Sequence, residues 1–250
     1  MVRLSVNVNK VATLRNSRGG AEPDIAKAVE TCIAAGAPGI TVHPRADQRH
    51  IRPDDVHRIS RLLAPLRDGV EFNIEGDPRP DLIDMVLEVA PHQCTLVPVV
   101  PGEITSQAGW RPDAAEQLRP VLAKLHEREI RVSLFVDADR SAVEWAAKLG
   151  ADRVEIYTEP FARAFEAGPQ QAAESFARFA AAADRAAELG LGINAGHDLD
   201  LENLVLFRTL PGLDEVSIGH ALISRALFHG LEGVVREYLA VLAEPPAQAP

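Results

Sequence analysis

The chain has 250 residues, of which 46% are hydrophobic, and its formal net charge is −10. The acidic balance argues against a general nucleic-acid binder, which needs a dominant basic surface. The chain has no apolar stretch of the roughly 18 residues that a membrane span requires and no secretory segment at its start, so we expect no membrane partner and a cytoplasmic location. Two cysteines, Cys32 and Cys94, fall in a predicted helix and a predicted strand, which disfavours a disulfide framework or a zinc site.

Short β-branched runs alternate with helical patterns along the whole chain. The predicted strands are residues 4–8, 39–42, 71–74, 93–97, 131–136, 153–157, 191–194 and 215–218. A long loop, residues 9–21, follows the first strand, and a helix opens at Pro23-Asp24 and closes at Gly36. Further helices are predicted from residue 53, over 82–89 and 112–128, up to 150, over 169–189, near 201–209, and in one or two closing segments before 245.

Eight strands alternating with helices in this length predict an α/β fold, a closed (β/α)₈ TIM barrel. The alternative is an open doubly wound sheet, which often carries a glycine-rich dinucleotide fingerprint in its first loop. Here that loop has only Gly19-Gly20. We expect a single barrel domain over residues 1–244, followed by a disordered Pro/Ala-rich tail at 245–250.

In such a barrel, polar residues at the carboxyl ends of the strands point into one mouth. Arginine forks and glycine turns at helix starts suit phosphate or carboxylate groups, while histidines and carboxylates suit proton transfer. We therefore expect acid–base chemistry on phosphorylated substrates. The candidates are Asn7, Asn9, Lys10, Arg15, Arg18, His43, Arg45, Arg49, His50, Asn73, Glu75, Glu155, His197, Asp198, Gly219 and His220.

Several of these residues also have plainer interpretations. The cationic segment at 43–50 is alternatively a solvated basic loop, and His197 a helix cap or loop contact. Glu75 is alternatively a solvated carboxylate, and Glu155 a buried ion-pair partner. A metal site built from His43, Glu75, His197 and His220 is the competing chemistry, although the nearby arginines and Lys10 would repel a cation.

The motifs as a set resemble the pyridoxine 5′-phosphate synthase family of vitamin B6 biosynthesis, from Leu4 to about Tyr238. The matching segments are residues 11–16 and 18–20, 39–43 and 49–52, 73–75, 132–139, 194–197 and 217–221. The resemblance implies a TIM barrel with extra helices, a homo-octamer and no metal or organic cofactor. It implies condensation of 3-amino-2-oxopropyl phosphate with 1-deoxy-D-xylulose 5-phosphate, releasing phosphate and water.

The resemblance also implies residue roles. His43 and Glu75 correspond to proton acceptors, His197 to the proton donor and Glu155 to a transition-state stabiliser. The positions that bind the amino-ketone phosphate correspond to Asn7, Arg18, Gly219 and His220. Those that bind the deoxyxylulose phosphate correspond to Arg45, His50 and Thr105.

Three segments differ from the family pattern. Asn9-Lys10 stands where the family usually has Asp-His, at the deoxyxylulose phosphate site. Val99-Val100-Pro101-Gly102 follows Pro98 in place of a Glu-Lys-Arg loop, and Asp198 replaces the glycine after the catalytic histidine. These differences motivate two alternative hypotheses: a paralogue that joins a similar amino-ketone to another carbonyl compound, and a catalytically silent ligand-binding homologue.

Overall fold

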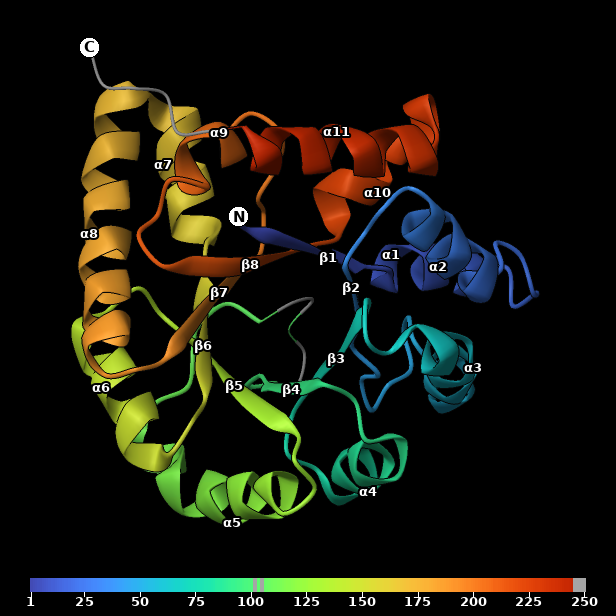
Figure 1. Ribbon diagram of the computed structural model, residues 1–250, viewed down its shortest axis with the longest axis horizontal. Coiled ribbons are helices and arrows are strands. Elements are labelled where there is room, and N and C mark those ends of the chain that lie inside the picture. The colour runs from blue at the N-terminus through green and yellow to red at the C-terminus, as the bar shows by residue number, and fades with distance from the viewer. Residues whose placement is uncertain (101–102, 104–105, 245–250) are drawn as a thin grey trace.

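Eight parallel strands close into a barrel, with helices around its outside, in the computed structural model, which describes residues 1–100, 103 and 106–244 (Figure 1). Each strand pairs with its sequence neighbour, and β1 pairs with β8 to close the ring. The strands are β1 (Arg3–Asn7), β2 (Gly39–Val42), β3 (Glu71–Gly76), β4 (Gln93–Leu96), β5 (Arg131–Val136), β6 (Arg153–Tyr157), β7 (Gly192–Gly196) and β8 (Leu213–Ile218). The predicted barrel is confirmed, and the open sheet is excluded. The tail at 245–250 lies outside the described residues.

The helices begin and end where local chemistry favours it. The Asp24 side chain accepts hydrogen bonds from the backbone of Ala26 and Lys27, Pro53 occupies the first turn of its helix, and Gly150 ends another at a φ of 94°. The α-helices are α1 (Asn9–Asn16), α2 (Ile25–Ala34), α3 (Pro53–Leu63), α4 (Pro80–Val89), α5 (Ala115–His126), α6 (Arg140–Leu149), α7 (Glu159–Ala167), α8 (Pro169–Glu188), α9 (Leu204–Phe207), α10 (His220–His229) and α11 (Leu231–Ala243). Short 3₁₀ turns occupy Ala64–Leu66 and Pro112–Ala114.

Two helices were not predicted from the sequence. The expected loop at 9–21 is helical over α1, and α7 follows β6 directly before the expected α8. Neither helix has a side-chain N-cap hydrogen bond, and α1 also has no acidic residue in its first turn. The start of α7 does carry local signals, Glu159 and Pro160 in its first turn, which sequence reasoning missed. The helix expected near 201–209 forms only over α9.

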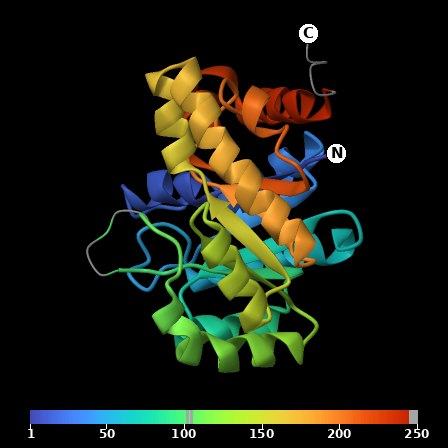
Figure 2. The ribbon, with the colours of Figure 1, turned by 90° about the vertical axis from the view of Figure 1, so that its left-hand side faces the viewer.

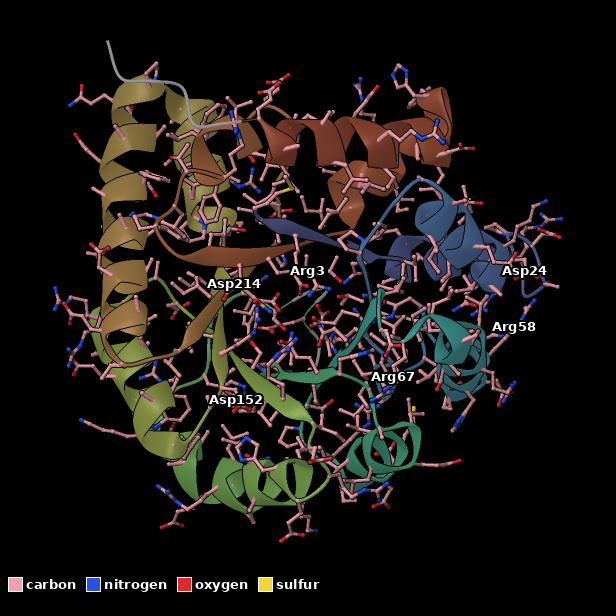
Figure 3. The ribbon with its side chains drawn as sticks, in the orientation of Figure 1. Arg3, Asp24, Arg58, Arg67, Asp152 and Asp214 are labelled. Carbon is pink, nitrogen blue, oxygen red and sulfur yellow. The ribbon has the colours of Figure 1, made fainter. Side chains whose placement is uncertain are left out.

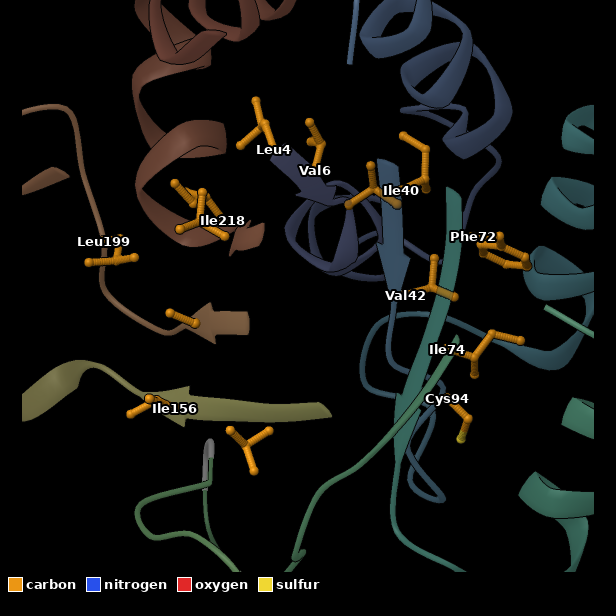
Figure 4. Packing of buried hydrophobic residues seen from close by; sticks show 14 of the residues in the cluster. Leu4, Val6, Ile40, Val42, Phe72, Ile74, Cys94, Ile156, Leu199 and Ile218 are labelled. Atoms are coloured by element: carbon orange, nitrogen blue, oxygen red, sulfur yellow. The ribbon is translucent and has the colours of Figure 1, made fainter. Parts of the chain in front are cut away.

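The apolar core lies between the barrel and the helices. Alternate residues of each strand point outward, where they are fully or almost fully buried, as Leu4, Ile40, Ile74 and Ile218 show (Figure 4). At about 25 cal/mol per Å² of buried apolar surface, this shell supplies most of the favourable burial free energy of the fold. Within the described residues, no helix is long and apolar enough to cross a bilayer.

The inside of the barrel is polar, unlike the branched aliphatic filling that is usual for this fold. A chain of hydrogen bonds crosses it: Ser5 and Thr41 lie 2.6 Å apart, Asn73 donates to Thr41 at 3.3 Å, and Thr95 donates to Asn73 at 3.1 Å. At the amino-terminal end of the strands, Arg131 and Arg3 both pair with Glu71. Arg3 and Asp214 mark this end in Figure 3.

The opposite end of the barrel carries the long loops. The loop after β4 lies beside the loop after β2, where Arg49 donates to the carbonyl oxygen of Glu103 at 3.1 Å (Figure 2). These loops rim the carboxyl ends of the strands, which is where enzymes of this architecture hold their substrates.

Candidate active site

A cavity of about 480 Å³ opens at the carboxyl ends of the strands. It brings together nearly all of the residues that the sequence singled out. The predicted residues that line it are Asn7, Asn9, Lys10, His43, Arg45, Arg49, His50, Glu75, Glu155, His197, Asp198, Gly219 and His220. Its size and its convergent polar groups are typical of a small-molecule site.

Four predicted residues are not placed in this cavity: Arg15, Arg18, Asn73 and Thr105. Asn73 lies inside the barrel, where it donates to Thr41. Arg18 is exposed in the turn after α1 and does not line it. Thr105 lies outside the described residues. Among the lining residues that sequence reasoning missed are Thr13, Ser106, Phe135 and Ser217. Ser217 had a usable signal, because it lies two residues before Gly219 and so shares its face of β8.

His43 and Glu75 face each other across the ends of β2 and β3. His43 Nδ1 lies 3.9 Å from Glu75 Oε2, and His43 Nε2 has no hydrogen-bond partner among the described residues. Burial, helped by the nearby charges of His50, Arg45 and Arg79, holds the pKa of His43 well below its ordinary value. The ring is therefore neutral at pH 7 and able to accept a proton.

Glu75 is a buried carboxyl that forms no salt bridge with a lysine or an arginine among the described residues. Asn7 Nδ2 and Ser217 Oγ each donate to its oxygens at 3.4 Å. Burial raises the pKa of Glu75 to about 8, with the hydrogen bond from Ser217 opposing the shift and the charge of Glu215 adding to it. A carboxyl with a pKa this close to neutrality can both take up and release a proton during turnover.

Glu155 lies deeper, on β6, and points into the barrel. Burial first, and then the charge of Glu75, raise the pKa of Glu155 well above its ordinary value, while a hydrogen bond from Thr95 opposes them. A methyl group at Gly196 would lie 2.5 Å from Glu155 Oε1, so a larger residue there would displace the carboxyl group of Glu155. Glu155 has no salt bridge to a cation among the described side chains, and burial keeps it neutral instead.

His50 and Arg45 form the cationic and hydrogen-bonding wall after β2. The backbone N–H of Ile51 donates to His50 Nδ1 at 3.0 Å, which leaves the proton of the neutral ring on Nε2. Burial, followed by the charges of Arg45 and Lys10, lowers the pKa of His50 to about 4. Arg45 is 7% exposed and its Nε has no hydrogen-bond partner among the described residues. A buried guanidinium with a free donor is suited to a phosphate oxygen.

Three side chains from other elements hold this wall in place. Arg15 forms a two-pronged ion pair with Asp55, at 2.5 and 2.9 Å, and also donates to the carbonyl oxygen of His50 at 3.3 Å. Asn16 Nδ2 donates to the same carbonyl oxygen at 2.8 Å. Arg79 donates to the carbonyl oxygen of Pro44. Arg15 was a site candidate, but its side chain supports the wall from behind and does not line the cavity.

The opposite wall consists of the turns after β7 and β8. Gly219 precedes α10, so the first backbone N–H groups of that helix are open to an anion in the cavity. A methyl group at Gly219 would lie 3.1 Å from Asn7 Cβ, and this close approach requires glycine. His197 contacts the edge of Tyr157, with ring centroids 5.0 Å apart.

A search of the described residues finds no group of three or more histidine, cysteine, aspartate or glutamate side chains that could hold a metal ion. The arrangement instead combines two anion-binding walls with three buried or half-buried proton-transfer groups between them. Such a site can hold two phosphorylated molecules and move protons at their junction.

The sequence matches a known protein family over nearly its whole length. A model of the pyridoxal phosphate biosynthesis protein PdxJ matches residues 4–244. A pyridoxine 5′-phosphate synthase from Bacteroides thetaiotaomicron is 55% identical over 240 residues, which cover 95% of this chain and 98% of that protein. Synthases of the same name from Xanthomonas campestris pv. campestris and Leptospira biflexa are 53% and 46% identical, over 96% and 97% of this chain and 96% and 98% of their own lengths.

Solved structures confirm the fold alone. The phosphoribosyl anthranilate isomerase from Thermotoga maritima superimposes with a TM-score of 0.60 at 15% identity, covering 97% of this chain and 98% of that one. A 4-hydroxy-2-oxoglutarate aldolase gives a TM-score of 0.59 at 17% identity, covering 96% of this chain and 94% of that one.

Proposed function

The chain belongs to the family of the pyridoxal phosphate biosynthesis protein PdxJ. We propose that separate groups of residues at the mouth of its barrel bind the two substrates of pyridoxine 5′-phosphate synthesis and transfer the protons. The activity is the condensation of 3-amino-2-oxopropyl phosphate with 1-deoxy-D-xylulose 5-phosphate to give pyridoxine 5′-phosphate, phosphate and water. Imine formation, enolisation, phosphate loss and ring closure all move protons, so several acid–base groups must surround one pocket.

The amino-ketone phosphate binds at the wall after β8. The backbone N–H groups at the start of α10 point at its phosphate, Gly219 allows close approach, and His220 and Asn7 line the same side. Arg18 belongs to this subsite by resemblance; in the single chain it is exposed and away from the cavity.

The deoxyxylulose phosphate binds at the wall after β2. Arg45 supplies a buried guanidinium, His50 donates through Nε2, and Lys10 adds an ammonium group at the rim. Thr105 belongs to this subsite by resemblance to the family, and Asn9 occupies a position of the same subsite where the family usually has aspartate. The two anion-binding walls thus fit two phosphates inside a protein whose net charge is −10.

The proton-transfer groups lie between these walls. His43 is neutral and buried, so it accepts a proton; Glu75, with a pKa of about 8, accepts and returns one; His197 donates. Glu155 is neutral when the pocket is empty, and as a hydrogen-bond donor it stabilises negative charge that develops on the substrate. The observation that carries the proposal is the pairing of His43 with Glu75 at 3.9 Å between the two walls.

Mixing the purified protein with both phosphates tests the proposal directly. Pyridoxine 5′-phosphate should appear by fluorescence and mass, together with one inorganic phosphate for each ring formed. Omission of either substrate is the control. Consumption of the amino-ketone with another carbonyl compound only would favour the paralogue instead.

We also propose that the protein assembles as a homo-octamer, in keeping with the family resemblance. Support comes from α10, where Phe228 is 86% exposed and Leu227 is 67% exposed, and from α1, a helix in contact with α10, where Leu14 is 51% exposed. Apolar side chains gathered on two neighbouring helices are typical of a contact between copies. Light scattering should show a particle several times heavier than the 27.0 kDa chain, and Phe228→Lys should reduce its mass.

A further inference from the structure

The turn after β7 holds an aspartate against the proposed proton donor. Asp198 Oδ2 lies 2.8 Å from His197 Nδ1, which is hydrogen-bonding distance between the side chains of adjacent residues. The hydrogen bond to His197 is the main reason that the pKa of Asp198 is below its ordinary value, so the carboxylate is charged at neutral pH. His197 Nδ1 therefore carries the proton of this bond.

The backbone at this turn is in an uncommon conformation. His197 has a φ of 93° and Asp198 a φ of 58°, a region that L residues other than glycine rarely adopt. Two side chains hold it: Thr158 Oγ1 donates to the carbonyl oxygen of Gly196 at 2.8 Å, and Asn203 Nδ2 donates to that of Asp198 at 3.1 Å. Glycine at position 198 would adopt this positive φ without strain, yet this chain has an aspartate there.

The charge of Asp198 is unfavourable for binding phosphate, because the residue lines the same cavity as Gly219 and His220. Its side chain thus works against affinity for an anion while contacting the histidine. The geometry points to a role in orienting His197 and not in holding the substrate.

We propose that Asp198 is the positioning residue of His197: its carboxylate accepts the Nδ1 hydrogen bond and holds the ring in one orientation in the cavity, so that the ring, when protonated at both nitrogens, donates the Nε2 proton to the substrate. This rests on the proposed role of His197 as proton donor. The same division of roles between a carboxylate and an imidazole is known from hydrolase triads, where the carboxylate orients the ring and does not itself react.

Asp198→Asn and Asp198→Gly test this, with the deoxyxylulose and amino-ketone phosphates as substrates. We expect kcat to fall by about tenfold or more in both variants. KM for the two phosphates should stay level or fall, because a negative charge has been removed from the cavity. The unfolding temperature of Asp198→Gly should equal or exceed that of the wild type, since glycine fits the positive φ.

Ala90→Gly is the matched control. Ala90 ends α4 at a φ of 47°, away from the cavity, so glycine there should be equally well tolerated and should leave kcat unchanged. Wild-type kcat in Asp198→Gly would overturn the proposal. So would a loss of activity that comes with raised KM values and a lower unfolding temperature, which would indicate a structural role only. A wild-type protein without synthase activity would instead refute the proposed function.

Discussion

Asn9 Oδ1 accepts a hydrogen bond from the backbone N–H of His43 at 2.9 Å, and this bond joins the start of α1 to the loop that carries the proposed base. An aspartate at position 9 would offer the same oxygen. Asparagine in place of the family's aspartate at this position therefore removes a negative charge but keeps the hydrogen bond from the His43 backbone. Lys10, its neighbour, is exposed at the rim of the cavity, where a change of side chain need not disturb the barrel.

The first prediction follows from this bond. Asn9→Asp combined with Lys10→His should change the affinity for deoxyxylulose phosphate by at most about tenfold, or roughly 1.4 kcal/mol, because the contact to His43 survives. Steady-state kinetics on both proteins measures it. A wild type with negligible turnover that the double substitution rescues would show that the pair defines another substrate.

The second prediction concerns the proton-transfer groups. His43→Ala, Glu75→Gln and His197→Ala should each lower turnover by about 10²-fold or more while the particle mass stays that of the wild type. Rates at saturating substrate, with light scattering on the same samples, provide the measurement. Near-normal turnover in any two of the three would contradict the assignment.

The third prediction concerns the support behind His50. Arg15→Met should lower the free energy of unfolding by about 3 kcal/mol, because it leaves the half-buried carboxylate of Asp55 without its partner. Arg58→Met is the matched control: Arg58 lies on α3, the helix that carries Asp55, and pairs with Asp24 at 2.8 Å, but at the exposed surface, where little should change (Figure 3). Denaturant unfolding measures the stability of both variants. Equal losses would contradict a special contribution of the buried Arg15–Asp55 ion pair.

Asn16→Ala tests whether the hydrogen bond to the His50 backbone affects substrate binding without a large change in the free energy of unfolding. Asn16 is only partly buried, so its loss should cost little stability, yet it removes the 2.8 Å bond to the carbonyl oxygen of His50. We expect KM for deoxyxylulose phosphate to rise more than KM for the amino-ketone phosphate. An equal rise for both substrates would argue against a local effect at the wall after β2.

The fourth prediction is a pH dependence at the amino-terminal end of the barrel. Burial, helped by the charge of Glu71, raises the pKa of Glu215 to about 8, above the ordinary value of 4.5. Between these values the folded protein holds a proton that the unfolded chain has released, so this group makes stability fall as pH rises from about 4.5 to 8. The slope is at most about 1.4 kcal/mol per pH unit.

Glu215→Gln removes that titration. The unfolding temperature of the variant, relative to the wild type, should therefore increase from pH 5 to pH 8 in scanning calorimetry. A difference that is constant with pH would show that Glu215 titrates alike in the folded and unfolded chains.

The barrel was predictable because its strands and most helices carry local signals. Asp24, Pro53 and Gly150 mark helix boundaries through their own side chains or backbone, and the structure has helices starting or ending at each. The start of α1 has no such mark, and its helix forms because Val11 and Ala12 pack against the barrel, which is a tertiary effect.

Most of the site residues were predictable because they lie at the carboxyl ends of predicted strands. The distances and hydrogen bonds between them were not. The sequence places His43 and Glu75 on successive strands, and only the register brings them within 3.9 Å. The two conformational features that matter at His197, its positive φ and its hydrogen bond to Asp198, have no counterpart in a pattern of residue types. Likewise, the support from Arg15 depends on a helix that the sequence did not reveal.

Because the barrel has a polar lining, inward and outward side chains of a strand have different physical roles. On β1, Leu4 and Val6 belong to the outer shell, while Ser5 faces Thr41 inside. On this strand, the outward positions serve packing and the inward positions serve hydrogen bonding. A change at an inward position of this strand therefore alters the polar lining without opening a cavity in the outer shell, and its cost in stability depends on whether the hydrogen bonds of the lining are still made.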